Sequence, residues 1–98
     1  PGSRELTVAH LGDGNIHYNI RKNPDMDAAV WEQQTGALES LLFDVVAQFG
    51  GSFSAEHGIG SQKRATLRTY ASPEKLNLMR VLKEALDPAG LMNPGKVL

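Results

Sequence analysis

The stretch Glu5-Leu-Thr-Val-Ala-His10-Leu-Gly-Asp13-Gly14-Asn-Ile-His17-Tyr-Asn-Ile20 sets the first part of the fold. Asp13-Gly14 is typical of a two-residue type I′ turn, in which both central residues have positive φ. We therefore predict a β-hairpin over residues 5–22 with His10 opposite His17, and opposed residues share one face of a hairpin. One face then carries an apolar set suited to a core, and the other carries a polar set suited to a site. The apolar set is Leu11, Ala9, Ile16, Tyr18 and Ile20, and the polar set is His10, His17 and Asn19.

The rest of the chain has mainly helical patterns. Asn23-Pro24-Asp25 combines a capping residue, a proline and an acid, so a long helix should begin there and end at Gly50-Gly51. A short strand over residues 52–55, a short helix near residues 62–70 and a helix from Ser72-Pro73 to Asp87 should follow. This order predicts an α+β fold in which helices cover one face of a small antiparallel sheet, as in a fragment of a ferredoxin-like fold. Its exposed edges predict packing against another domain or a second copy.

The composition limits the kind of partner. A chain of 98 residues forms at most one small domain. Ten Lys and Arg against eleven Asp and Glu leave a net charge of −1, so the chain has no basic field for nucleic acid. Without cysteine, a metal must be bound through imidazole and carboxylate. No apolar stretch reaches the ~20 residues that span a bilayer, and no signal-peptide core is present, which favours the cytoplasm of a bacterium.

His10 and His17 are candidate metal ligands. Directly opposed residues of a hairpin have Cβ atoms ~4.5–5.5 Å apart, which lets two imidazoles share one ion. Glu56, after the long helix, would complete a set of two histidines and one carboxylate that leaves coordination positions open for water or substrate. The spacing is equally compatible with two surface histidines that make ordinary hydrogen bonds.

His57 is the candidate general base. In an extended segment the side chains of Glu56 and His57 diverge, so that one can bind a metal while the other addresses a substrate. A neutral histidine is the usual general base near pH 7. The alternative is that Glu56 caps a helix and that His57 bonds to the backbone. The basic residues that follow are better explained as a solvated helix face than as an anion site: Lys63, Arg64 and Arg68.

Three blocks of the sequence resemble the carboxyl-terminal part of the FAD-linked oxidase family, within the vanillyl-alcohol oxidase superfamily. This family includes D-2-hydroxyglutarate, D-lactate and glycolate dehydrogenases. The blocks bracket almost the whole chain and stand in the family's order. They are His10-Leu-Gly-Asp-Gly-Asn-Ile-His17-Tyr-Asn19, Ser54-Ala-Glu-His-Gly-Ile-Gly60 and Leu86-Asp-Pro-Ala-Gly-Leu-Met-Asn-Pro-Gly-Lys96.

The resemblance implies roles for the first two blocks. His10, His17 and Glu56 would bind a divalent metal, zinc or manganese. Asn19 would contact the substrate, a small 2-hydroxy acid. His57 would take the hydroxyl proton of this acid while hydride passes from its α-carbon to N5 of the flavin.

The resemblance also implies a role for the last block and for the chain as a whole. Asn93 and Lys96 would contact FAD. Residues 1–98 would form the single C-terminal substrate and metal domain of an oxidoreductase acting on CH-OH groups, with the N-terminal flavin domain as its partner. Alone the chain should be inactive, because nothing in it accepts a hydride, and its uncovered apolar surface would favour a homo-oligomer. The alternatives are a non-catalytic metal-binding or dimerisation module and a hydrolase with the same two-histidine, one-glutamate set.

Overall fold

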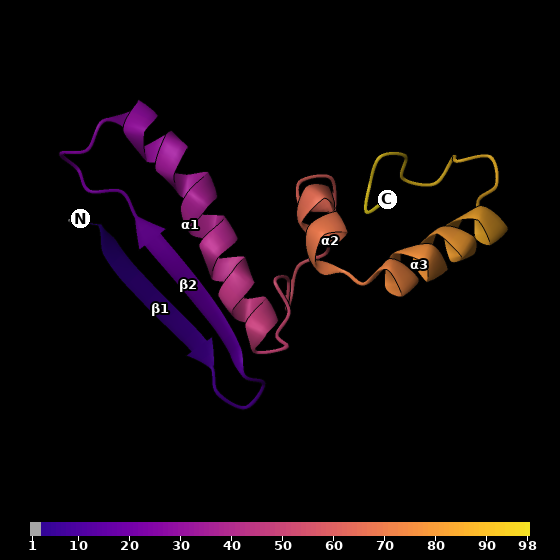
Figure 1. Ribbon diagram of the computed structural model, residues 1–98, viewed down its shortest axis with the longest axis horizontal. Helices are drawn as coiled ribbons and strands as arrows, with labels where there is room; N and C mark the ends of the chain where they lie inside the picture. Colours follow the sequence, from indigo (N-terminus) through magenta and orange to yellow (C-terminus); the bar gives the residue numbers. More distant parts are fainter. Residues whose placement is uncertain (1–2) are drawn as a thin grey trace. The chain divides into compact units, whose positions relative to one another are not determined.

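The computed structural model describes residues 3–98 and divides into two compact units, Pro1–Ala55 and Glu56–Leu98 (Figure 1). The first unit holds β1 (Arg4–His10), β2 (Asn15–Arg21) and α1 (Ala28–Gln48), and the second holds α2 (Arg64–Tyr70) and α3 (Pro73–Leu86). β1 and β2 form a two-stranded antiparallel sheet. The predicted α+β class is confirmed. Within the described part of the chain, no helix combines the length and the apolar character needed to cross a membrane.

The predicted hairpin is confirmed, but its predicted register is wrong. His10 pairs with Asn15, and His17 pairs with Val8. The strands are therefore joined by the longer loop of residues 11–14 rather than by Asp13-Gly14 alone. The N–H of Asp13 donates to the carbonyl oxygen of His10 at 3.1 Å, and Gly14 completes the loop with a φ of 64°. Because the error is an even number of residues, every strand residue keeps its predicted face.

The apolar face of the hairpin is not a closed core. Leu11 was expected on this face, but it lies in the loop and is 93% exposed. Ile16 is on the expected face and is still 63% exposed. On the same face the Tyr18 hydroxyl donates to the Glu5 carboxylate at 2.5 Å, between strands. The hairpin is thus held mainly by its backbone ladder and by cross-strand pairs.

Helix α1 begins later than predicted and runs alongside β2 (Figure 1). Asn23 was expected to cap it, but the Asn23 carbonyl accepts the N–H of Met26 at 3.0 Å and closes a separate turn. Asp27 caps the helix instead, and its carboxylate accepts the N–H of Ala29 at 2.8 Å and that of Val30 at 3.3 Å. The start of the helix is therefore set by Asp27, whose side chain accepts backbone N–H groups of the first turn.

The strand expected over residues 52–55 is absent, and these residues form an irregular loop. The Ser52 hydroxyl accepts the N–H of Ser54 at 3.3 Å, which curves the backbone. Phe53 packs edge-on against Phe43 of α1, with ring centroids 5.8 Å apart. A local hydrogen bond and a side-chain anchor take the place of ladder pairing.

The second unit follows the predicted pattern closely. Ser72 caps α3 by accepting the N–H of Lys75 at 3.2 Å, and Pro73 is its first residue. Leu67 of α2 and Leu76 of α3 are 4% and 9% exposed, and they are the buried apolar residues of the described chain. Each of the two helices thus has one buried leucine.

Candidate metal and substrate site

The two candidate histidines lie on one face of the hairpin. His10 ends β1, and His17 is near the start of β2. Because His10 pairs with Asn15, the two imidazoles are diagonal neighbours rather than the directly opposed pair that was predicted. Their ring centroids are 5.3 Å apart and their planes meet at 63°. Diagonal neighbours are still within reach of long side chains, so the register error leaves the pair intact.

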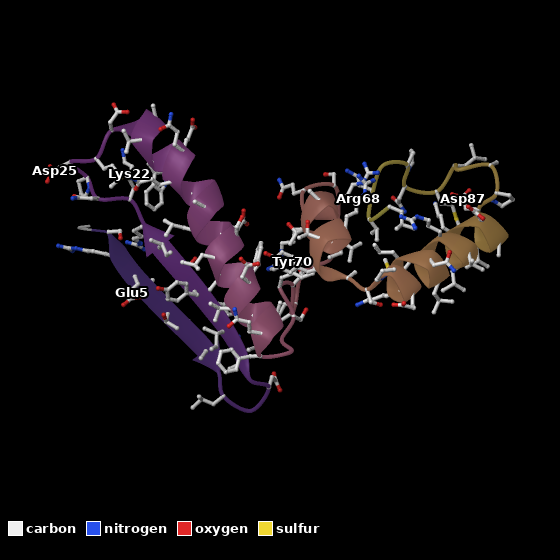
Figure 2. All side chains as sticks on the ribbon, in the orientation of Figure 1. Glu5, Lys22, Asp25, Arg68, Tyr70 and Asp87 are labelled. Atoms are coloured by element: carbon white, nitrogen blue, oxygen red, sulfur yellow. The ribbon has the colours of Figure 1, made fainter. Side chains whose placement is uncertain are left out.

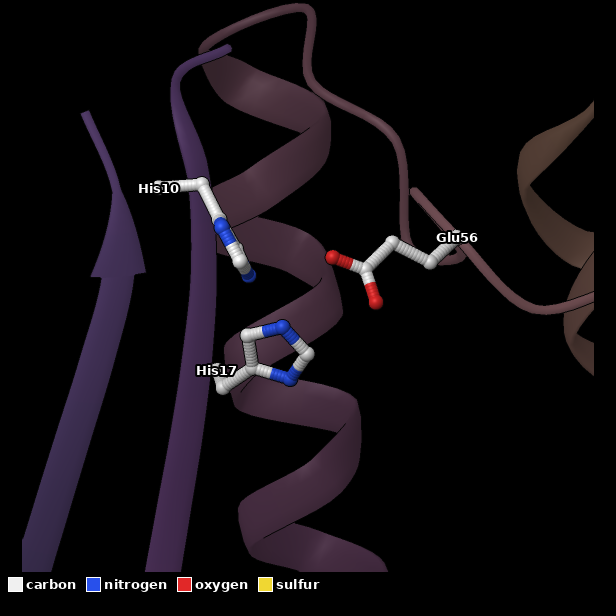
Figure 3. A group of neighbouring side chains, drawn as sticks. All are labelled: His10, His17 and Glu56. Atoms are coloured by element: carbon white, nitrogen blue, oxygen red, sulfur yellow. The ribbon is translucent and has the colours of Figure 1, made fainter. Parts of the chain in front are cut away.

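Glu56 directly follows Ala55, within the segment that connects α1 to α2. His10, His17 and Glu56 each offer one ligand atom, and these atoms lie within 4.8 Å of one another. Figure 3 shows the Glu56 carboxylate turned toward the two imidazoles. His17 is half-buried and the other two are exposed, so the group is open to small solutes. The structure thus brings together the three residues that the sequence singled out as ligands.

Two further candidates adjoin these residues in the chain. Asn19 follows His17 by two positions on β2 and shares its face of the hairpin. His57 follows Glu56, and both Asn19 and His57 are exposed. Their roles toward a substrate stay predictions.

The segment after α3, residues 88–98, is called the tail. It contains the candidates Asn93 and Lys96 and belongs to the second unit. The Asn93 carbonyl accepts the N–H of Lys96 at 3.2 Å, and Asn93 has a φ of 49°. The N–H of Val97 donates to the carbonyl oxygen of Gly60 at 2.8 Å. This bond joins the tail to the loop that begins with Glu56 and His57. Residues 56–60 of the second block and the last block therefore belong to the same unit.

Asp87 is a buried acid with several hydrogen-bond partners, a role that was not predicted from the sequence. It was expected only to end a helix, but it is 8% exposed at the end of α3, where the tail begins (Figure 2). The hydrogen bond from Lys83 holds the pKa of the Asp87 carboxyl below its usual value, and the backbone N–H groups of Met92 and Leu91 act in the same direction against the effect of burial. The one sequence signal for this role is an acid placed directly before a Pro-Ala-Gly turn, whose backbone N–H groups need acceptors.

Comparison of the sequence with known protein families identifies the family of this chain. Residues 4–97 match the family described as FAD linked oxidases, C-terminal domain, and the chain belongs to this family.

The similar proteins within this family include dehydrogenases of two kinds. The chain is 41% identical to D-2-hydroxyglutarate dehydrogenase of Stutzerimonas stutzeri over 99% of its own length and 21% of that protein. It is 45% identical to the mitochondrial D-2-hydroxyglutarate dehydrogenase of Bos taurus over 91% of its length and 15% of that protein. It is 34% identical to D-lactate dehydrogenase of Anaerostipes hadrus over 96% of its length and 20% of that protein. The chain therefore spans about a fifth or less of the length of these relatives.

Proposed function

We propose that this chain is the part of an FAD-dependent 2-hydroxy-acid dehydrogenase that binds a divalent metal and the substrate and that supplies the general base. The observation that carries the proposal is the convergence of His10, His17 and Glu56. Support for the reaction class comes from the relatives, whose names specify D-2-hydroxyglutarate and D-lactate dehydrogenases. Both substrates are D-2-hydroxy carboxylates, and we propose a member of this class as the substrate.

The donor set fits a divalent transition metal. Two imidazoles and a carboxylate suit zinc, manganese, iron or cobalt, of which we propose zinc or manganese. Ligand atoms bound about 2.1 Å from one ion are at most about 4.2 Å apart. The observed spread of 4.8 Å needs only a small closing of the three side chains around an ion. When bound, the cation supplies Lewis-acid polarisation of a hydroxyl or carboxylate oxygen.

The chain's own residues then have separate tasks. Asn19 orients the 2-hydroxy acid by hydrogen bonding, from the same hairpin face as His17. His57 would accept the hydroxyl proton of the substrate on an imidazole nitrogen, and a bound flavin would supply the hydride acceptor. Asn93 and Lys96 hold the flavin from the tail. The rest of a full-length protein provides the main flavin pocket.

Metal analysis of the full-length protein that carries this segment tests the ligand set. We expect one equivalent of zinc or manganese in the wild type, and a loss of affinity of more than about 100-fold in His17→Ala and in Glu56→Ala, beyond the usual effect of losing an outer-shell partner. The matched control is His57→Gln, a neighbour of Glu56 outside the proposed ligand set. Equal metal loss in the control, or no metal in the wild type, would contradict the assignment.

The same control variant tests the proposed base. His57→Gln should retain metal and FAD while kcat falls by about 10²–10⁴-fold, the usual contribution of a general base. The measurement is dye reduction with D-2-hydroxyglutarate and with D-lactate. Unchanged kcat in a metal-loaded His57→Gln protein would rule out this role.

A further inference from the structure

Asp87 has an unusual position for an acid, because it is the one buried polar residue within residues 3–98. Its two carboxylate oxygens have different partners. Oδ1 accepts the N–H of Leu91 at 2.8 Å, and Oδ2 accepts the N–H of Met92 at 2.9 Å. Lys83, one helical turn earlier, donates to Oδ2 and also to the carbonyl oxygen of Met92. The carboxylate thus closes the turn through which the chain leaves α3.

The segment after this turn is held at its far end as well. The N–H of Val97 donates to the Gly60 carbonyl, and Val97 has a φ of 66°, which is unfavourable for a β-branched residue. Such a conformation persists only where surrounding contacts fix it. Asp87 holds the start of the tail by hydrogen bonds to Leu91 and Met92, and Gly60 holds its end by a hydrogen bond to Val97. Asn93 and Lys96 lie between these two anchored segments.

We propose that Asp87 is a positioning residue that fixes the tail against Gly60 and thereby sets the positions of Asn93 and Lys96. The part of this inference that concerns the flavin rests on the proposed function, in which these two residues contact FAD. The part that concerns the tail rests on the hydrogen bonds alone.

The chemistry requires a carboxylate rather than an amide. Each oxygen of Asp87 accepts a different backbone N–H, and Oδ2 also accepts from a lysine. In Asp87→Asn the amide oxygen can serve only one of these N–H groups, and the NH2 group faces the other, donor against donor. The ion pair with Lys83 is also lost, because the amide carries no charge.

The test compares Asp87→Asn with the matched control Asp25→Asn in the full-length flavoprotein. Asp25 is an exposed acid of the first unit. Site-resolved amide hydrogen exchange should become at least about tenfold faster at Leu91, Met92 and Val97 in Asp87→Asn, as expected when a hydrogen bond to a charged group is lost. The amides of α3 around Leu76 should keep their rates. FAD affinity, measured by flavin fluorescence, should fall about tenfold, and Asp25→Asn should change neither property.

The outcomes separate the two parts of the inference. Unchanged exchange at Val97, or an equal increase throughout α3, would overturn the positioning role, because the effect would then be local or a general loss of stability. Faster exchange at Val97 with unchanged FAD affinity would support positioning and would refute the flavin contacts of the proposed function. If Asp87→Asn does not fold, Lys83→Met replaces it. That variant should accelerate exchange at Met92 and Val97, and its failure to do so would overturn the proposal.

Discussion

The two units of the chain are stabilised in different ways. The second has buried residues in both helices and at the end of α3, namely Leu67, Leu76 and Asp87. Within residues 3–55 of the first, no residue is buried, and α1 leaves Leu41 62% exposed. The first unit relies on a backbone ladder, a helix cap and partial packing, whereas the second adds buried leucines and a partly buried ion pair between Lys83 and Asp87. The two histidines therefore lie in the unit whose described residues include no buried one.

The difference in burial between the two units predicts that the largest loss of stability on mutation is at Leu67. Leu67→Ala should lower the stability of the second unit by about 2–4 kcal/mol, because the side chain is 4% exposed and its removal leaves a cavity. The matched change Leu41→Ala in α1 should cost no more than about 0.5–1 kcal/mol, because much of that side chain already contacts water. Site-resolved hydrogen exchange during urea titration would measure both. Trp31, the one tryptophan of the chain, reports on the first unit.

Equal costs for Leu67→Ala and Leu41→Ala would contradict the comparison. That result would mean that α1 buries its apolar stripe as effectively as α2 buries Leu67. A transition of Trp31 fluorescence that moved with Leu67→Ala would show instead that the two units unfold together.

The same difference explains what could be predicted from the sequence. The second unit was predicted well because its signals are local: Ser72-Pro73 starts a helix and Asp87-Pro88 ends it. The hairpin, too, was recognised from Asp13-Gly14, and its faces were correct. Its register was not, because Gly14 has a positive φ and Asp13 does not, so the dipeptide forms part of a four-residue loop instead of a type I′ turn.

Other features depended on contacts that no local pattern encodes. Residues 52–55 were expected to form a short strand, but Phe53 contacts Phe43 of α1 and the segment does not pair with a strand. Asn23 and Asp27 are both residue types that favour helix caps. Asn23 closes a separate turn with Met26, and Asp27 therefore caps the helix. The convergence of Glu56 with the histidines was anticipated from the residue types and the family resemblance, whereas the network around Asp87 joins residues whose pairing depends on a turn geometry that the sequence does not specify.

The two units should also respond to pH in opposite directions. The pKa of Asp87 is lowered by Lys83, so its contribution is present above the unfolded pKa of about 3.9 and is lost as pH falls through the folded value. The pKa of Tyr18 is raised by its hydrogen bond to Glu5, so its contribution is present below the unfolded pKa of about 10 and is lost as pH rises through the folded value. Acid below about pH 4 should weaken the second unit, and alkali above about pH 10 should weaken the hairpin.

Hydrogen exchange and unfolding midpoints across these pH ranges would measure the effect, with Asp87→Asn and Tyr18→Phe as paired variants. Each variant should reduce the pH dependence of its own unit and leave that of the other unchanged. Some acid dependence should survive in Asp87→Asn, because the pKa of Glu74 is also lowered, by its own backbone N–H and then by the Ser72 hydroxyl. An acid transition that began in the hairpin would contradict this assignment.

The smallest expected effects are at the helix caps, where the two units should behave alike. Asp27 accepts two backbone N–H groups of α1, and Ser72 accepts one of α3. Asp27→Ala and Ser72→Ala should each cost about 1 kcal/mol, because a cap acts on its own helix end whether or not that helix has a buried face. The caps thus isolate the local contribution that both units share, and urea titrations of the two variants would measure it. If Asp27→Ala cost several times more than Ser72→Ala, the first unit would depend on its local hydrogen bonds far more than the second, and the contrast between the units would be one of local structure as well as of burial.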